Sequence, residues 1–447
     1  MNLPPPMTNT WQPSGAMQTK TVAPLKAQPG REYRPQPELL MPAGDLEKLQ
    51  TALLFGGDAV YVGGLEYSLR AYAGNFDLAA LGKGVEFAHS MGKKVYVAVN
   101  ILAHNRHLQE LPLYLEKLGE LNVDGLIVSD PGVIKLAKHH VPQIPLTVST
   151  QANVTNYISA EVFREMGAQR IVLARELALD EIAAIKARVG VEIEVFIHGA
   201  MCVSYSGRCL LSYYMTGRSA NQGACAHPCR YRYALQEEKR PGQYFPIEED
   251  HHGTYILNSR DLCLLNYIPQ LIEAGVDAFK VEGRMKSPLY TAVTACVYRQ
   301  AIDKWLSERS PYLLPDLDAW HLELQGIATR PYTTGFICGP SDELQDTAKM
   351  PLENHHFEFC GVVKGYDYQR GMIEVEQRAN FGPGEDLEIM IPPGDIRKLA
   401  LTELYDDEGN PLDRARHARQ RVWIPLAEPV VPNSILRRVV RSTGHAE

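Results

Sequence analysis

A cluster of cysteines limits what this chain can be more than any other feature of its sequence. Four of the eight cysteines lie within 28 residues, separated by gaps of six, fifteen and three residues: Cys202, Cys209, Cys225 and Cys229. Thiols gathered so closely in a chain without a secretory signal are typical of metal ligands rather than of disulfides. Because thiolate sulfur is a soft ligand, the candidates are zinc, an iron–sulfur cluster and copper(I). Four reduced cysteines packed without a metal are the alternative.

The gaps favour iron–sulfur over zinc. Four thiolates are the usual complement of a [4Fe–4S] cluster. Structural zinc sites usually pair their ligands at gaps of about two to four residues, and only Cys225 and Cys229 do so here. Cys263 could replace one of the four ligands. However, it lies in an amphipathic pattern from Asp261 to Ile272 that predicts a helix with Cys263 in the core.

The composition is that of an ordinary soluble globular protein, with 45% apolar and 22% charged residues among 447. This length suffices for one large domain and a smaller one. The sequence shows neither a membrane span nor a signal peptide, so we expect a cytoplasmic protein without a membrane partner. The net charge of −8 argues against non-specific coating of nucleic acid, but it is compatible with a local basic patch. The sequence does not predict an oligomeric state.

From Pro37 onwards, short apolar segments alternate with helical patterns. The eight segments are Leu39–Met41, Ala59–Val62, Val95–Val99, Gly125–Val128, Leu146–Val148, Ile171–Leu173, Ile193–Ile197 and Ala278–Val281. Continuous apolar strands between helices indicate a parallel sheet that is covered on both faces. Eight such units predict an α/β fold, a TIM-like (β/α)₈ barrel over residues 37–310. A doubly wound open sheet is the alternative, but no G-x-G-x-x-G motif follows the first segment.

The remaining segments differ from the barrel in composition and in residue pattern. Residues 1–36 hold seven prolines and predict a disordered extension. The cysteines lie in a long insertion after the seventh strand, residues 198–263, which we expect to cover the C-terminal end of the barrel, its mouth. Residues 311–356 are interpreted as a connector after a helix that begins at Ser287. Alternating apolar residues and Gly-Pro turns predict a small antiparallel β-barrel, or a sandwich, at 357–430, followed by a basic tail at 431–447.

In a (β/α)₈ barrel, chemistry is done where the strands end. The sequence places candidate catalytic residues there, namely His198, Asn100 and Gln151. Candidate substrate-binding residues are Arg175, Arg208, Glu282, Arg284 and Lys286. Because a guanidinium matches a carboxylate with two hydrogen bonds, the arginines and Lys286 favour an anionic ligand. The alternatives are a hydrogen-bonded structural histidine at His198 and a local salt bridge that involves Arg284.

Two further charged features are visible. Glu194 lies within the seventh apolar segment, and a buried carboxylate must be paired, so we expect an ion pair between Glu194 and an arginine. Between Pro411 and Arg441 there are seven arginines against two acids, a local charge of +5. The arginines that alternate with small residues could follow a nucleic-acid backbone, with a solvated loop as the alternative: Arg414, Arg416, Arg419 and Arg421.

The cysteine stretch resembles the full signature of the collagenase-like peptidases, unclassified-peptidase family thirty-two. Ten residues carry this resemblance: Glu194, Phe196, Gly199, Ala200, Met201, Cys202, Gly207, Cys209, Leu211 and Ser212. Further matches lie at Pro37–Gly44, Asp58–Gly64, Val148–Asn156 and Lys280–Pro288. The similarity extends from about Pro37 to Pro429.

The resemblance implies a TIM-like barrel and, despite the family name, an oxygen-independent hydroxylase that depends on prephenate, a small dicarboxylic acid that the predicted anion-binding residues would suit. It implies that the four clustered cysteines hold a [4Fe–4S] cluster, with zinc as the alternative metal. Branches of the family hydroxylate the wobble uridine of tRNA at carbon five, a cytidine of ribosomal RNA, or the ubiquinone ring. The chain length and the C-terminal β module resemble the tRNA branch, so tRNA is the expected partner of the four arginines.

Two other functions remain open at this point. A peptidase is suggested by the family name, but the sequence lacks both H-E-x-x-H and G-x-S-x-G. A non-enzymatic module, stabilised by zinc and binding RNA or protein, is the third possibility.

Overall fold

The computed structural model describes residues 36–69, 74–201, 211–218, 220, 224–226, 228, 249–250, 253–254, 260–339 and 355–441. The expected disordered extension at 1–36 lies, apart from Gln36, outside the described residues.

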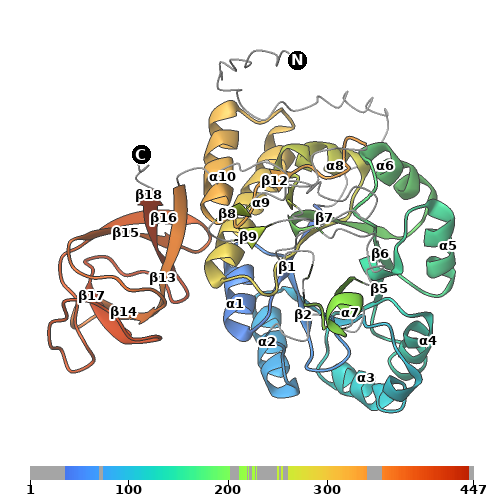
Figure 1. Ribbon diagram of the computed structural model, residues 1–447, viewed down its shortest axis with the longest axis horizontal. Coiled ribbons are helices and arrows are strands. Elements are labelled where there is room, and N and C mark those ends of the chain that lie inside the picture. The colour runs from blue at the N-terminus through green and yellow to red at the C-terminus, as the bar shows by residue number, and fades with distance from the viewer. Residues whose placement is uncertain are drawn as a thin grey trace, which may run out of the picture.

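In the described part of the chain, eight parallel strands close into a barrel (Figure 1). They are β1 (Glu38–Pro42), β2 (Ala59–Gly63), β3 (Lys94–Val99), β4 (Gly125–Val128), β5 (Leu146–Val148), β6 (Arg170–Val172), β7 (Glu192–Ala200) and β11 (Ala278–Val281). Strand β11 pairs with both β7 and β1, which closes the ring. The (β/α)₈ prediction is therefore confirmed, and each predicted apolar segment coincides with one of these strands.

Helices surround the strands and cover the outer face of the barrel (Figure 1). They are α1 (Leu46–Leu54), α2 (Leu78–Ser90), α3 (Leu111–Glu120), α4 (Pro131–His140), α5 (Tyr157–Glu165), α6 (Leu179–Arg188), α8 (Ile268–Ala274) and α9 (Pro288–Glu308). Several begin at a side chain that accepts a hydrogen bond from the first turn, as the sequence predicted for Ser287 at α9. Among the described residues, no helix combines the length and apolar composition needed to cross a bilayer.

The insertion after β7 contains α7 (Leu211–Thr216), β8 (Glu249–Asp250) and β9 (Gly253–Thr254). The chain returns as β10 (Asp261–Cys263), which runs antiparallel to β7 and also pairs with β12 (Tyr332–Thr333). The single helix predicted from Asp261 is therefore wrong at its start. Because β7 is longer than its neighbours, its end offers β10 a free edge, and α8 begins only at Ile268, next to Pro269. Cys263 nevertheless lies in the core, as expected.

The C-terminal module is a six-stranded antiparallel sheet that follows helix α10 (Leu314–Gly326). Its strands are β13 (His355–Asp367), β14 (Met372–Gln377), β15 (Glu385–Ile391), β16 (Asp395–Leu401), β17 (Arg421–Pro425) and β18 (Ile435–Arg441). The boundary predicted at residue 430 is wrong, because β18 lies between β13 and β15 inside the sheet. Its arginines suggested a tail, but they pair with acids of other segments, Arg437 with Glu323 and Arg438 with Glu358.

The module is attached to the helices of the barrel by ion pairs. Arg437 is buried, donates two hydrogen bonds to Glu323 of α10, at 2.6 and 2.9 Å, and lies over the Phe357 ring. The Phe357 ring also lies against Gly326 at the end of α10, where a Cβ atom would approach it to 2.2 Å. Arg378 of the module contacts both carboxylate oxygens of Glu47 in α1.

A buried network of charges crosses the inside of the barrel. Glu194 of β7 is fully buried and lies 2.9 Å from Lys280 of β11 and 3.3 Å from Arg170 of β6. Arg170 also lies 2.6 Å from Glu38 of β1. Burial lowers the pKa of Lys280 below its ordinary value, although Glu194 opposes this change. The predicted pair between Glu194 and an arginine is thus confirmed, and Lys280 is a second cationic partner.

We expect Glu194→Gln to lower the free energy of unfolding by about 3–5 kcal/mol, because it leaves two buried cations short of a counter-charge. Urea unfolding followed by circular dichroism measures this loss. The matched control is Glu192→Gln, since the Glu192 side chain also pairs with Arg170 but is 54% exposed. The control is expected to cost at most about 1 kcal/mol. Equal losses in the two variants would contradict a stabilising role for the buried network.

Candidate functional site

An amide network lies at the mouth, where β3 and β5 end. The side-chain amino group of Asn100 donates to Ser149 Oγ and to Gln151 Oε1, each at 3.2 Å. The Ser149 hydroxyl also donates to Gln151 Oε1. The Leu69 backbone N–H donates to Asn100 Oδ1 at 3.1 Å. The structure therefore brings together two of the three predicted catalytic residues, Asn100 and Gln151, and adds Ser149 between them.

Arg284 follows β11 and is fixed against the end of β2. Its side chain is buried, and a Cβ atom on Gly63 would lie 2.0 Å from Arg284 Nη1 and 2.5 Å from Ser68 Oγ. A Cβ atom on Gly44, after β1, would lie 2.3 Å from the Arg284 carbonyl oxygen. These two glycines are needed for close approach rather than for backbone freedom. They explain why short glycine motifs follow the first two strands.

The other predicted substrate-binding residues after β11 are arranged differently. Lys286 Nζ donates to Thr329 Oγ1 at 2.7 Å, and it lies 3.8 Å from Asp261 of β10. The Glu282 carbonyl oxygen accepts a hydrogen bond from Tyr290 of α9. Lys286 therefore contacts β10 and the segment at Thr329, whereas Arg284 packs against the ends of the first two strands.

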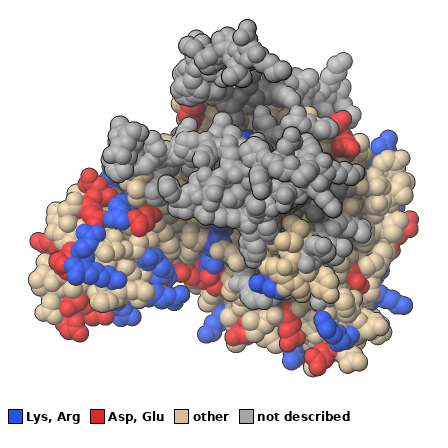
Figure 2. Space-filling model, in the orientation of Figure 1, with Lys and Arg blue, Asp and Glu red and all other residues tan. Residues whose placement is uncertain are grey.

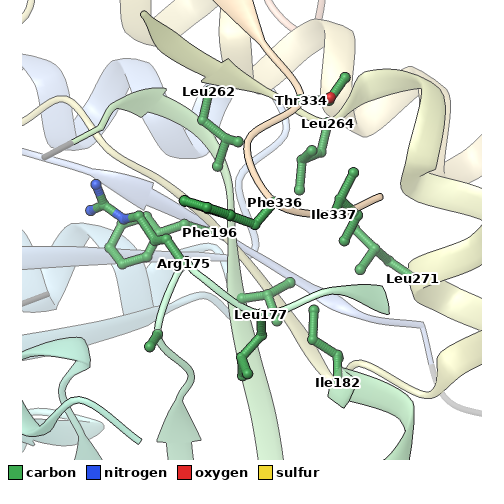
Figure 3. A pocket seen from close by; sticks show the side chains of 12 residues that line it. Arg175, Leu177, Ile182, Phe196, Leu262, Leu264, Leu271, Thr334, Phe336 and Ile337 are labelled. Carbon is green, nitrogen blue, oxygen red and sulfur yellow. The ribbon is translucent and has the colours of Figure 1, made fainter. Parts of the chain in front are cut away.

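Arg175, after β6, holds the end of β7. Its Nη1 donates to the Ala200 carbonyl oxygen, and its guanidinium carbon lies 3.9 Å from the centre of the Phe196 ring. Figure 3 shows the guanidinium beside Phe196 and directed away from the apolar side chains of Leu177 and Ile182. The apolar cavity at that position has a volume of about 20 Å³. Arg175 thus fixes the residue two positions before Cys202.

His198 is enclosed by aromatic rings. It is 1% exposed, its Nδ1 lies 3.1 Å from Tyr298 Oη, and ring centres of Tyr290 and Tyr332 lie 5.9 and 5.2 Å away. Burial and the nearby Lys286 charge lower the pKa of His198 to about 3. The imidazole is therefore neutral near pH 7. This environment favours the structural interpretation of His198 over proton donation by an imidazolium.

Only part of the cysteine cluster belongs to the described residues. Cys225 is half-buried, and the backbone N–H of its neighbour Ala226 donates to Ser212 Oγ of α7 at 2.9 Å. The predicted ligands Cys202, Cys209 and Cys229, and the predicted binding residue Arg208, lie outside the described residues. By its chemistry alone, a donor set of four thiols suits a [4Fe–4S] cluster and also suits zinc.

The predicted RNA-binding arginines are mostly paired with acids. Arg414 lies 2.6 Å from Glu385, Arg421 lies 2.9 Å from Glu374, and Arg416 pairs with Asp413. Figure 2 shows positive and negative side chains interspersed over the visible face of the module. Burial raises the pKa of Glu376, but a hydrogen bond from Arg378 and the charges of nearby cations, Arg419 the smallest contributor among them, lower it below its ordinary value. The local charge of +5 counted along the chain is thus partly balanced by acids from other strands.

Two tyrosines at the rim of the mouth were not predicted from the sequence. Tyr67 lies in the loop after β2 with a left-handed φ angle of 59°, and its ring centre lies 5.1 Å from that of Tyr114 in α3. The Tyr114 hydroxyl lies against Gly64, where a Cβ atom would approach it to 2.0 Å. The consecutive glycines Gly63 and Gly64 were the available signal for this close approach.

We expect the enclosed His198 to make stability depend on pH. The unfolded chain binds a proton at His198 below about pH 6.5, but the folded chain keeps the imidazole neutral down to a pKa of about 3. The free energy of unfolding therefore decreases as the pH falls from about 6.5 towards 3. Replacing His198 with Gln is expected to flatten this slope, and His89→Gln, on the surface of α2, to retain it. A His198 titration midpoint near 6.5 by NMR would overturn this expectation.

Two family models match the chain. The model described as peptidase family U32 matches residues 44–347, and the model described as the peptidase family U32 C-terminal domain matches residues 355–437. The first match contains the barrel strands from β2 onwards together with the insertion, and the second contains most of the six-stranded module.

Three named relatives match most of the chain. The tRNA hydroxylation protein P1 of Bacillus subtilis is 39% identical, over 90% of this chain and 95% of the relative. The tRNA hydroxylation protein P of Escherichia coli is 36% identical, over 90% of this chain and 96% of the relative. A 23S rRNA 5-hydroxycytidine synthase of Escherichia coli is 39% identical, over 61% of this chain and 40% of the relative. The chain therefore belongs to peptidase family U32.

Proposed function

We propose that this protein is an RNA-modifying enzyme that hydroxylates carbon five of the wobble uridine in tRNA, without molecular oxygen and with prephenate as co-substrate. The observation that carries the proposal is the near full-length similarity to two proteins named for tRNA hydroxylation, each matched over at least 95% of its own length. The ribosomal relative is named for 5-hydroxycytidine. Its product is therefore also a pyrimidine hydroxylated at carbon five.

The cofactor in this proposal is a [4Fe–4S] cluster held by Cys202, Cys209, Cys225 and Cys229. Such a cluster supplies electron transfer, which amino acid side chains do poorly, whereas zinc has no redox chemistry. The role of the chain is to hold the donor set at the mouth. Arg175 supports this role, because it fixes Ala200 just before the first cysteine.

The other groups at the mouth suit the two substrates. Prephenate carries two carboxylates, and the fixed guanidinium of Arg284 matches a carboxylate geometrically. Asn100 and Gln151 offer neutral amides for a nucleobase. Carbon five of uracil is poorly reactive, so the contribution expected from these residues is alignment of the reactants and a fixed electrostatic field.

Peptide cleavage by a cysteine has less chemical support. A nucleophilic thiol requires a lowered pKa, but burial raises the pKa of Cys296 and of Cys360 to about 12. Burial also raises the pKa of the Cys263 thiol. These three thiols are therefore inert packing groups, and the sequence offers no metalloprotease or serine-hydrolase motif in their place.

We expect the protein to restore hydroxylated wobble uridine in a bacterium that lacks its own tRNA hydroxylation proteins. Replacing Cys225 with Ser is expected to lower this product by at least about 100-fold and to remove iron and sulfide from the purified protein, because a cluster ligand is lost. Mass spectrometry of tRNA nucleosides measures the product. Cys338→Ser, at an exposed thiol outside the cluster, is the control. It is expected to retain both the hydroxylated product and the bound iron and sulfide. Full hydroxylation by the Cys225 variant, or a zinc-loaded and iron-free wild type, would refute the proposed chemistry.

The arginine loop is tested by tRNA binding at several salt concentrations. Neutralising Arg416, Arg419 and Arg421 together is expected to weaken binding and to reduce the slope of log affinity against log salt by up to about two to three. The control neutralises three exposed lysines of the barrel helices instead, Lys83, Lys117 and Lys135. Identical binding isotherms for the arginine variant and the wild type would show that the loop is solvated and does not contact tRNA.

A further inference from the structure

We propose that Gln151 determines which pyrimidine this enzyme accepts. Its side-chain amino group donates a hydrogen bond to the 4-carbonyl oxygen of uracil and thereby disfavours cytosine, which carries a 4-amino group. This inference rests on the proposed function, RNA hydroxylation at the barrel mouth.

The direction of the amide network fixes which end of Gln151 faces outwards. A backbone N–H can only donate, so the atom of Asn100 that lies 3.1 Å from the Leu69 nitrogen is its carbonyl oxygen. The amino group of Asn100 must then face Ser149 and Gln151. An amino group can also only donate, so the Gln151 atom at 3.2 Å is Oε1. The orientation of both amides therefore follows from one backbone N–H.

The side-chain oxygen of Gln151 accepts two hydrogen bonds, one from the Asn100 amino group and one from the Ser149 hydroxyl. Within the part of the chain that the structure describes, its amino group forms no hydrogen bond. Asn100 and Ser149 are buried, whereas Gln151 is only half-buried. Gln151 thus presents a donor and no acceptor at the mouth.

The network is held in place by neighbouring backbone. The loop after β2 is fixed to the end of β3, because the Ile101 N–H donates to the Tyr67 carbonyl oxygen at 3.3 Å. Tyr67 adopts its left-handed backbone conformation there, close to the Leu69 nitrogen that orients Asn100. Below Gln151, Thr150 Oγ1 donates to the Leu173 carbonyl oxygen at 3.2 Å. The donor of Gln151 is therefore pre-positioned before any substrate arrives.

A fixed donor favours uracil because uracil presents a carbonyl oxygen at the position where cytosine presents an amino group. Two opposed donors leave both hydrogen-bonding groups unsatisfied, and a site built for one partner strongly rejects the other. A carboxylate is the competing acceptor, but the guanidinium of Arg284 suits an acid better than a neutral amide does. Discrimination is a real need in this family, since one relative is named for 5-hydroxycytidine.

The test uses two reporter tRNAs that differ only in a uridine or a cytidine at the wobble position. Wild-type protein is expected to form about tenfold to hundredfold more hydroxylated product from the uridine reporter than from the cytidine reporter. Gln151→Glu keeps the size and the accepted hydrogen bonds but presents a second acceptor oxygen, so the ratio of uridine to cytidine product is expected to fall by about the same factor. Gln151→Leu presents neither a donor nor an acceptor. It is expected to lose the preference because the uridine product decreases, while the cytidine product does not increase.

A positioning variant and a binding measurement complete the test. The side chain of Asn100→Asp cannot donate to Gln151, so the Gln151 amide is free to rotate and exchange the positions of its oxygen and nitrogen. Part of the base preference is therefore expected to be lost, with the iron content unchanged. Binding of anticodon stem-loops with uridine or cytidine, measured by fluorescence anisotropy, is expected to show the same preferences without turnover.

The outcomes separate this inference from the proposed function. Wild-type protein that hydroxylates neither reporter would refute the function itself. Wild-type activity on uridine, with the base ratio unchanged in folded Gln151→Glu and Gln151→Leu variants, would refute the role of Gln151 alone. An unchanged base ratio with a raised prephenate requirement would assign the Gln151 donor to a carboxylate and also overturn the inference.

Discussion

The pairing of one buried carboxylate with two cations is the constraint on which the rest of the structure depends. Glu194 of β7 contacts Lys280 of β11 and Arg170 of β6, and Arg170 continues to Glu38 of β1. The network therefore joins four neighbouring strands across the point where the barrel closes. Removing one member leaves charges in a dry interior, which costs far more than the loss of an exposed ion pair. Closure in turn forces the C-terminal ends of all eight strands to meet at the mouth.

Two kinds of polar group meet there, and different strands supply them. Arg284, after β11, is buried and packs against Gly63 at the end of β2, and its guanidinium is the group proposed to bind the acid. The amide network of Asn100, Ser149 and Gln151, after β3 and β5, is neutral and presents a hydrogen-bond donor. The cysteine segment begins after β7, and Arg175 holds the end of that strand. This division suits the proposed reaction, in which an acid and a base of RNA bind at once.

The sequence predicted the barrel well because buried parallel strands are apolar along their whole length, which a single chain reveals directly. Glu194 was recognisable for the same reason, as a charge inside an apolar segment. Pairing between distant segments was not recognisable. Arg437 suggested a basic tail until Glu323 of α10 was found beside it, and Asp261 suggested a helix until the edge of β7 was found to pair with it. The donor of Gln151 depends on the Leu69 N–H, from a different loop.

The proposed reaction is tested most directly in an anaerobic chamber with purified protein, unmodified tRNA transcript and prephenate. We expect 5-hydroxyuridine at the wobble position, detected by mass spectrometry of the digested tRNA, only when protein, tRNA and prephenate are all present. Product that forms without prephenate, or only after oxygen is admitted, would contradict it.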